Sequence, residues 1–118
     1  MTDAVEGYAV LHTDGRVTYG QIPAGESAYE AIRREIPDLG SQGMGRLRAW
    51  FTDSFAGQRS NPLADTVLSA VGYHHPTGWA GPVAVSMEEV GEDCVVPPLT
   101  SEVRAMIDEL SRQHAPRS

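Results

Sequence analysis

The sequence predicts an α+β domain of two layers, in which about four mainly antiparallel strands carry three helices on one face. Three observations predict this class. The 118 residues suit a single domain. Short runs with strand-like apolar patterning are separated by turn residues. Three other segments each have a single apolar face at helical spacing, and one sheet can bury all of those faces. We therefore expect one globular domain over residues 1–118, with a frayed tail from about residue 113.

The N-terminal third predicts a hairpin followed by a helix. Residues 7–12 and 17–22 are strand-like, and Asp14-Gly15 between them is a strong hairpin signal. Ser27 and Glu30 have the spacing of a capping box, which predicts a helix that runs to Ile36. Residues 38–45 are rich in glycine, and we expect a loop there.

The middle of the chain predicts a strand and a central helix. Residues 46–52 alternate strictly, so Arg46, Arg48 and Trp50 share the face opposite the apolar one. Asn61 can cap a helix whose first position is Pro62. Gly72 can end that helix in the left-handed conformation.

The C-terminal third predicts a strand and a helix. Residues 73–80 contain aromatic, imidazole and turn-forming residues, which favours a loop. Residues 83–87 read as a strand, and residues 94–96 as a short further strand. Thr100 or Ser101 can cap a last helix with a regular apolar face.

Composition and charge exclude several classes of function. The net charge of −7 argues against nucleic acid as a partner, because phosphate binding needs clustered positive charge. All nine basic residues are arginine, so every cation is a planar, permanently charged guanidinium. No apolar run approaches membrane-spanning length, and residues 1–6 lack the positive charge of a signal peptide. We expect a cytoplasmic protein without membrane contact.

Two groups of residues are candidates for a binding site. Arg46, Arg48 and Trp50 combine guanidinium groups with an indole, which can hold an anion, a nucleotide base or a partner's acidic surface. The second group is the loop of residues 73–79, with the aromatic and imidazole side chains of Tyr73, His74, His75 and Trp79. Aromatic residues in such a loop are often interface anchors, and equally often cover the edge of a small core.

The two adjacent histidines also suggest an enzyme. His74 or His75, with Asp93 or Cys94, could bind a metal or act in hydrolysis. Their spacing does not match known metal motifs, and a lone cysteine is usually an inert apolar residue. No phosphate loop, nucleophile elbow or dinucleotide fingerprint occurs, so we expect neither a metal nor a cofactor.

The motifs around the central helix resemble those of a small domain family of unknown function from phages, plasmids and GC-rich bacteria. The resemblance is carried by Asp53, Gly57 and the run Asn61-Pro62-Leu63-Ala64, followed by Gly81-Pro82-Val83. It covers roughly residues 10–99. It implies a shared fold and a mobile-element context, but it identifies no active-site residues.

We hypothesise a non-enzymatic binding protein that acts on a partner protein or a small anionic ligand. One alternative is a small metal- or histidine-dependent hydrolase that uses the 73–79 loop. Another is an acidic DNA mimic, motivated by the net charge but opposed by the interspersed arginines. Exposed aromatic residues on a small domain are also consistent with a homodimer.

Overall fold

Five strands form one antiparallel sheet in the order β2-β1-β5-β4-β3. The computed structural model describes residues 7–54, 57–92 and 95–114. The strands are β1 (Tyr8–Leu11), β2 (Val17–Gly20), β3 (Leu39–Met44), β4 (Leu47–Thr52) and β5 (Val83–Met87). The helices are α1 (Ala28–Ile32), α2 (Pro62–Ala70) and α3 (Ser101–His114). The predicted α+β class is confirmed.

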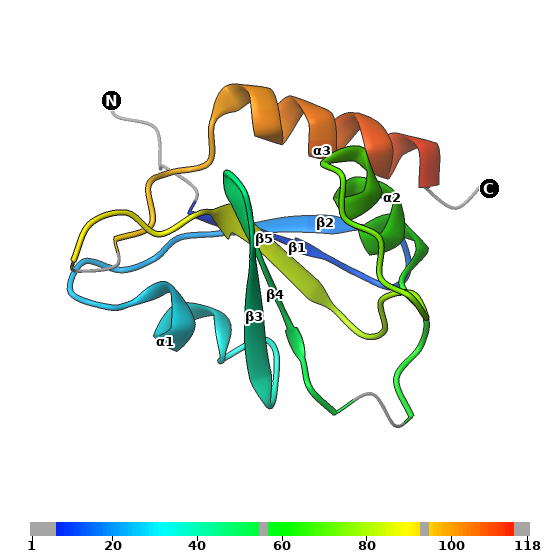
Figure 1. Ribbon diagram of the computed structural model, residues 1–118, viewed down its shortest axis with the longest axis horizontal. Coiled ribbons are helices and arrows are strands. Elements are labelled where there is room, and N and C mark those ends of the chain that lie inside the picture. The colour runs from blue at the N-terminus through cyan, green and yellow to red at the C-terminus, as the bar shows by residue number, and fades with distance from the viewer. Residues whose placement is uncertain (1–6, 55–56, 93–94, 115–118) are drawn as a thin grey trace.

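The helices lie on both faces of the sheet. Figure 1 shows α2 and α3 on one side and α1 on the other. The cause is visible in β1, where Ala9 and Leu11 belong to the core beneath α2 and α3, while Tyr8 and Val10 pack with α1. Because successive side chains of a strand point to opposite faces, a fully apolar strand needs cover on both sides. The expected placement of all three helices on one face therefore does not describe α1.

The glycine-rich segment forms strand β3 and not the expected loop. It pairs along its whole length with β4, from Leu39 opposite Thr52 to Met44 opposite Leu47. A Cβ on Gly43 would lie 2.5 Å from Oε2 of Glu88. The glycine thus makes room for the side chain of Glu88. This requirement explains why a strand contains glycine, a residue that sequence rules associate with loops.

The central helix has the ends that the sequence predicts. Asn61 is fully buried, and its side-chain oxygen accepts a hydrogen bond from the amide of Ala64 at 3.0 Å. Its side-chain amide donates to the carbonyl oxygens of Leu11 at 2.9 Å and Gly81 at 2.8 Å. One residue therefore caps α2 and ties it to the end of β1 and the start of the β5 segment.

Two other predicted elements differ in extent. The first helix begins at its Ser27 cap but ends at Ile32, and turns follow it. Val95 forms an isolated bridge with Val90 where a short strand was expected, and Cys94 lies outside the described residues. No helix within the described ranges combines the length and apolarity needed to cross a membrane.

Candidate ligand-binding site

The C-terminal end of α2 fixes the position of Tyr73. Gly72 adopts a φ of 94° and donates its amide to the carbonyl of Ser69 at 2.9 Å. The Tyr73 amide donates to the carbonyl of Leu68, also at 2.9 Å. These two bonds form a Schellman motif, in which the residue after the glycine folds back onto the last turn of the helix. Tyr73 accordingly packs against the core beneath α2 and α3.

A cavity of about 420 Å³ opens beside Tyr73, between the end of α2, the start of α3 and the β3–β4 turn. Its apolar side chains come from all three elements and are Met44, Leu47, Ala70, Val71, Val103 and Met106. The polar side chains around it are Arg46, Tyr73 and Glu102. Apolar walls with a few polar groups are the usual character of a small-molecule site.

Arg46 is the main cation of this cavity. It lies in the two-residue turn between β3 and β4, and its side chain is 79% exposed. Its nearest acidic partner is Glu102, at 4.0 Å, whose side chain is 82% exposed. The Tyr73 hydroxyl lies 3.8 Å from the point that a Cβ on Gly45 would occupy, so it is near the same turn. This hydroxyl has no hydrogen-bond partner among the described residues, which leaves it available to a ligand.

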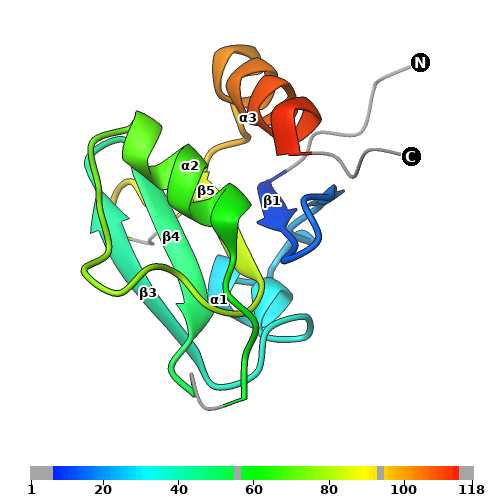
Figure 2. The same ribbon diagram turned by 90° about the vertical axis from the view of Figure 1, so that its right-hand side faces the viewer.

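The rest of the 73–79 loop lies beside β3, and Figure 2 shows this connection running down from the end of α2. A smaller cavity of about 110 Å³ separates the loop from the strand and is lined by Gln42, Met44, Tyr73, His74, His75, Pro76 and Trp79. The structure therefore brings together all four residues that the sequence indicates in this loop. Tyr73 and Met44 border both cavities.

Local contacts hold the two histidines and Trp79 in place. Nδ1 of His74 lies 3.0 Å from Oγ of Ser69, and Nδ1 of His75 lies 3.2 Å from the Thr77 amide. The His75 ring is tilted against that of Trp79, with the ring centres 4.9 Å apart. Trp79 is 3% exposed and packs in the core, so its indole acts as cover for the sheet.

The groups needed for the hydrolase alternative are only partly described. Asp93 and Cys94 lie outside the described residues. Across the part of the chain that the structure does describe, no three side chains of His, Cys, Asp or Glu form a group that could hold a metal ion. His74 and His75 are each engaged with a neighbouring hydroxyl or backbone group, as described above.

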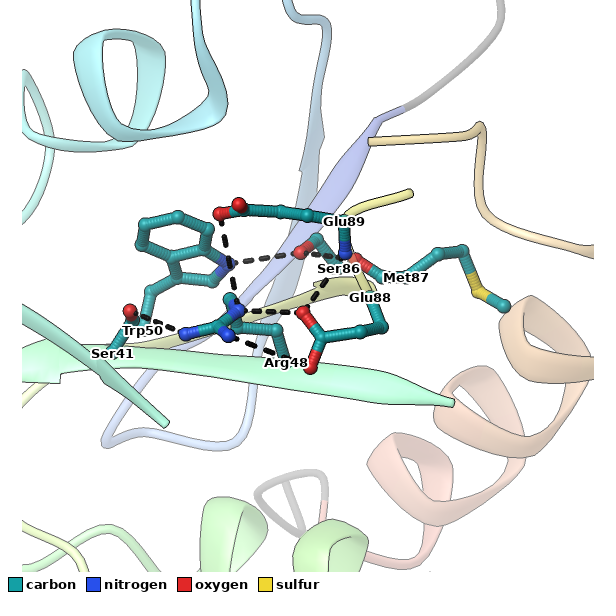
Figure 3. Close-up of polar contacts among 7 residues, drawn as sticks. All are labelled: Ser41, Arg48, Trp50, Ser86, Met87, Glu88 and Glu89. Atoms are coloured by element: carbon teal, nitrogen blue, oxygen red, sulfur yellow. Dashed lines mark hydrogen bonds and ion pairs between the residues drawn. The ribbon is translucent and has the colours of Figure 1, made fainter. Parts of the chain in front are cut away.

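Arg48 and Trp50 lie on the opposite face of the sheet, in a network of polar contacts (Figure 3). Nε of Arg48 donates to Oε1 of Glu88 at 2.7 Å, and Nη1 donates to Oγ of Ser41 at 2.8 Å. Trp50 is 2% exposed, and its indole nitrogen donates to Oγ of Ser86 at 2.9 Å. The three residues that the sequence groups on one strand thus do not form one surface.

Glu88 is the acidic centre of this network. Burial alone would raise the pKa of its carboxyl group, but hydrogen bonds from Arg48 and from the Glu89 amide outweigh that effect. The pKa of Glu88 is therefore held below its ordinary value. The charged form of Glu88 is the one that the fold stabilises.

Sequence reasoning missed several residues of the larger cavity. Met44 falls in the segment that the sequence assigns to a loop, Met106 is assigned to the apolar face of the last helix, and no sequence signal singles out Glu102. Each assignment concerns one element, whereas the cavity forms where three elements meet. The exposed Arg46 was the sequence signal that could have located it.

Comparisons with known proteins give no relative for this chain. No family model matches it, and no match emerges from the curated proteins or from the solved structures. The function must therefore be argued from the geometry of the site.

Proposed function

We propose that this protein binds a small ligand with an apolar body and one anionic group, in the cavity between Arg46, Tyr73 and Met106. The observation that carries the proposal is the cavity itself, which joins apolar walls to an exposed guanidinium and an unpartnered phenol hydroxyl. The binding is non-catalytic.

The volume and lining support this ligand class. A cavity of about 420 Å³ falls within the range of about 300–1,000 Å³ that is usual for small-molecule sites. Met44 and Met106 have flexible thioether side chains that adapt to the shape of an apolar ligand. Guanidinium groups bind carboxylates in a planar, two-pronged geometry, which Arg46 can offer with its exposed end.

Glu102 limits the strength of this site. Its carboxylate lies 4.0 Å from the Arg46 guanidinium and competes with an anionic ligand for it. Because both side chains are largely exposed, their mutual attraction is weak and a ligand carboxylate can replace it. A buried apolar body then supplies the larger part of the affinity.

Octanoate and octanol test the proposal, because they share an apolar chain and differ in charge. Calorimetric titration should show that octanoate binds with one site per chain and more tightly than octanol. Arg46→Ala should remove the preference for octanoate, and Ala70→Trp should block both ligands by filling the cavity from the exposed end of α2. Arg33→Ala, an exposed arginine beside α1, is the matched control and should bind like the unmodified protein.

Two results would reject this function. One is a lack of binding by either ligand, and the other is octanoate binding that Arg46→Ala and Ala70→Trp leave unchanged. The hydrolase and DNA-mimic alternatives and the mobile-element origin stay predictions from the sequence.

A further inference from the structure

Strand β3 is an open edge of the sheet. It is the last strand of the order β2-β1-β5-β4-β3, and no helix lies in front of it in Figure 1. The Asp53 amide donates to the carbonyl of Asp38 at 2.9 Å, which continues the β3–β4 ladder by one residue. Hydrogen-bonded pairs alternate along an antiparallel ladder. Asp38, Gly40, Gln42 and Met44 therefore bond to the β4 side.

The other residues of β3 direct their backbone groups outward. By the same alternation these are Leu39, Ser41 and Gly43. No described residue forms a hydrogen bond with the backbone amide or carbonyl of any of the three. An open edge is normally protected by charged side chains, proline or a bulge. The sequence of β3, Leu39 to Met44, contains neither charge nor proline, and its pairing with β4 is unbroken.

We propose that a second copy of this chain pairs with β3, strand against strand and antiparallel, with the two-fold axis at Ser41. In this register Ser41 faces Ser41 of the other copy, and Leu39 faces Gly43 at each end. All three pairs join outward-directed groups, which gives about six backbone hydrogen bonds between the copies. Leu39 lies opposite Gly43, which has no side chain, so this register brings no side chains into collision.

The charges at the two ends of β3 favour a second copy as the occupant. Asp38 and Asp53 stand exposed at one end, and Arg46 stands exposed at the other. Antiparallel pairing brings the acidic end of each copy to the basic end of its partner, so the complementarity occurs twice. A two-fold interface of this kind uses the same surface on both copies and closes at a dimer.

Sedimentation equilibrium from micromolar to millimolar concentration tests the proposal. The unmodified protein should show a monomer–dimer equilibrium. Ser41→Pro removes the central outward amide, and proline is tolerated at such a position of an edge strand. It should raise the dissociation constant by about tenfold or more. Ser41→Ala is the matched control, because it also loses the hydroxyl that accepts from Arg48 but keeps the amide, and it should dimerise like the unmodified protein.

Amide hydrogen exchange gives a second readout that is specific for the register. The amides of Leu39, Ser41 and Gly43 should exchange more slowly as the protein concentration rises, while Gly40 and Gln42, already bonded to β4, change little. A protein that stays monomeric throughout, or a dimer that Ser41→Pro leaves intact, would overturn the proposal. Octanoate titration at a concentration where the protein is monomeric tests the proposed function separately, so the failure of this inference and that of the proposed function can be told apart.

Discussion

Arg46 and Arg48 stand two positions apart in the sequence, yet their surroundings differ completely. The Arg48 side chain is 24% exposed and bonds to Glu88 and Ser41, whereas that of Arg46 is 79% exposed and reaches Glu102 only at 4.0 Å. The difference arises because Arg48 lies within β4, next to β5 and β3, while Arg46 lies in the turn before it. The fold uses the arginine inside the sheet for its own contacts, whereas the arginine in the turn keeps an exposed guanidinium.

Trp50→Ala should have the largest effect on stability, because Trp50 lies on the same structural face of the sheet as Arg48. The indole is buried between β4 and α1 and donates to Ser86. Removing a buried aromatic side chain costs about 3–5 kcal/mol of unfolding free energy. Urea denaturation measures this loss. A change below about 0.5 kcal/mol, the level of ordinary surface substitutions, would contradict the assigned burial.

Alanine variants of the two arginines should differ in their unfolding free energy. Arg48→Ala leaves the partly buried Glu88 without its main partner and should lower the unfolding free energy by about 1–3 kcal/mol. Arg46→Ala removes an exposed side chain and should change it by less than about 0.5 kcal/mol. The same denaturation experiment measures both. Equal losses would mean that the two positions do not differ as described.

The pH dependence of stability sharpens the account of Glu88. The pKa of this carboxyl group is lowered in the folded protein, so the unfolded chain takes up its proton at a higher pH. Its stabilising contribution is present above the ordinary carboxyl pKa and is lost as the pH falls through the lowered value. Glu88→Gln should therefore reduce the loss of stability on acidification. Melting temperatures between neutral and acidic pH measure the effect, and parallel profiles for the two proteins would contradict it.

Glu102→Gln should produce the smallest effect of these variants, and that effect should be on ligand affinity. Removing the competing carboxylate frees Arg46, and the weakness of an exposed ion pair limits the gain in octanoate affinity to about two- to fourfold. Octanol affinity should stay the same. Calorimetric titration of both ligands measures this, and a weaker octanoate affinity would show that Glu102 helps the ligand.

Local sequence signals predicted the local structure well. The cap at Asn61, the glycine that ends α2 and the hairpin at Asp14-Gly15 are all confirmed, because each depends on residues close in the sequence. The alternation in β4 correctly separated its two faces. The fold class followed from these elements.

Contacts between distant segments explain what the sequence could not predict. β3 was missed because its glycines make room for Asp53 and Glu88, which follow β4 and β5 and are distant from β3 in the sequence. The position of α1 depends on the pairing of β1 with both β2 and β5. The candidate site combines Arg46, Tyr73 and Met106 from three elements, and only their assembly creates the cavity.

Nuclear magnetic resonance of the methionine methyl groups with octanoate tests the central claim most directly. Of the four methionines, Met44 and Met106 line the cavity, whereas Met87 does not. We expect octanoate to shift the Met44 and Met106 signals with one common affinity, to affect Met87 little, and to need a higher concentration for the same shifts in Arg46→Ala. Shifts at Met87 without shifts at Met44 and Met106, or none at any methionine, would contradict a ligand site between the β3–β4 turn, α2 and α3.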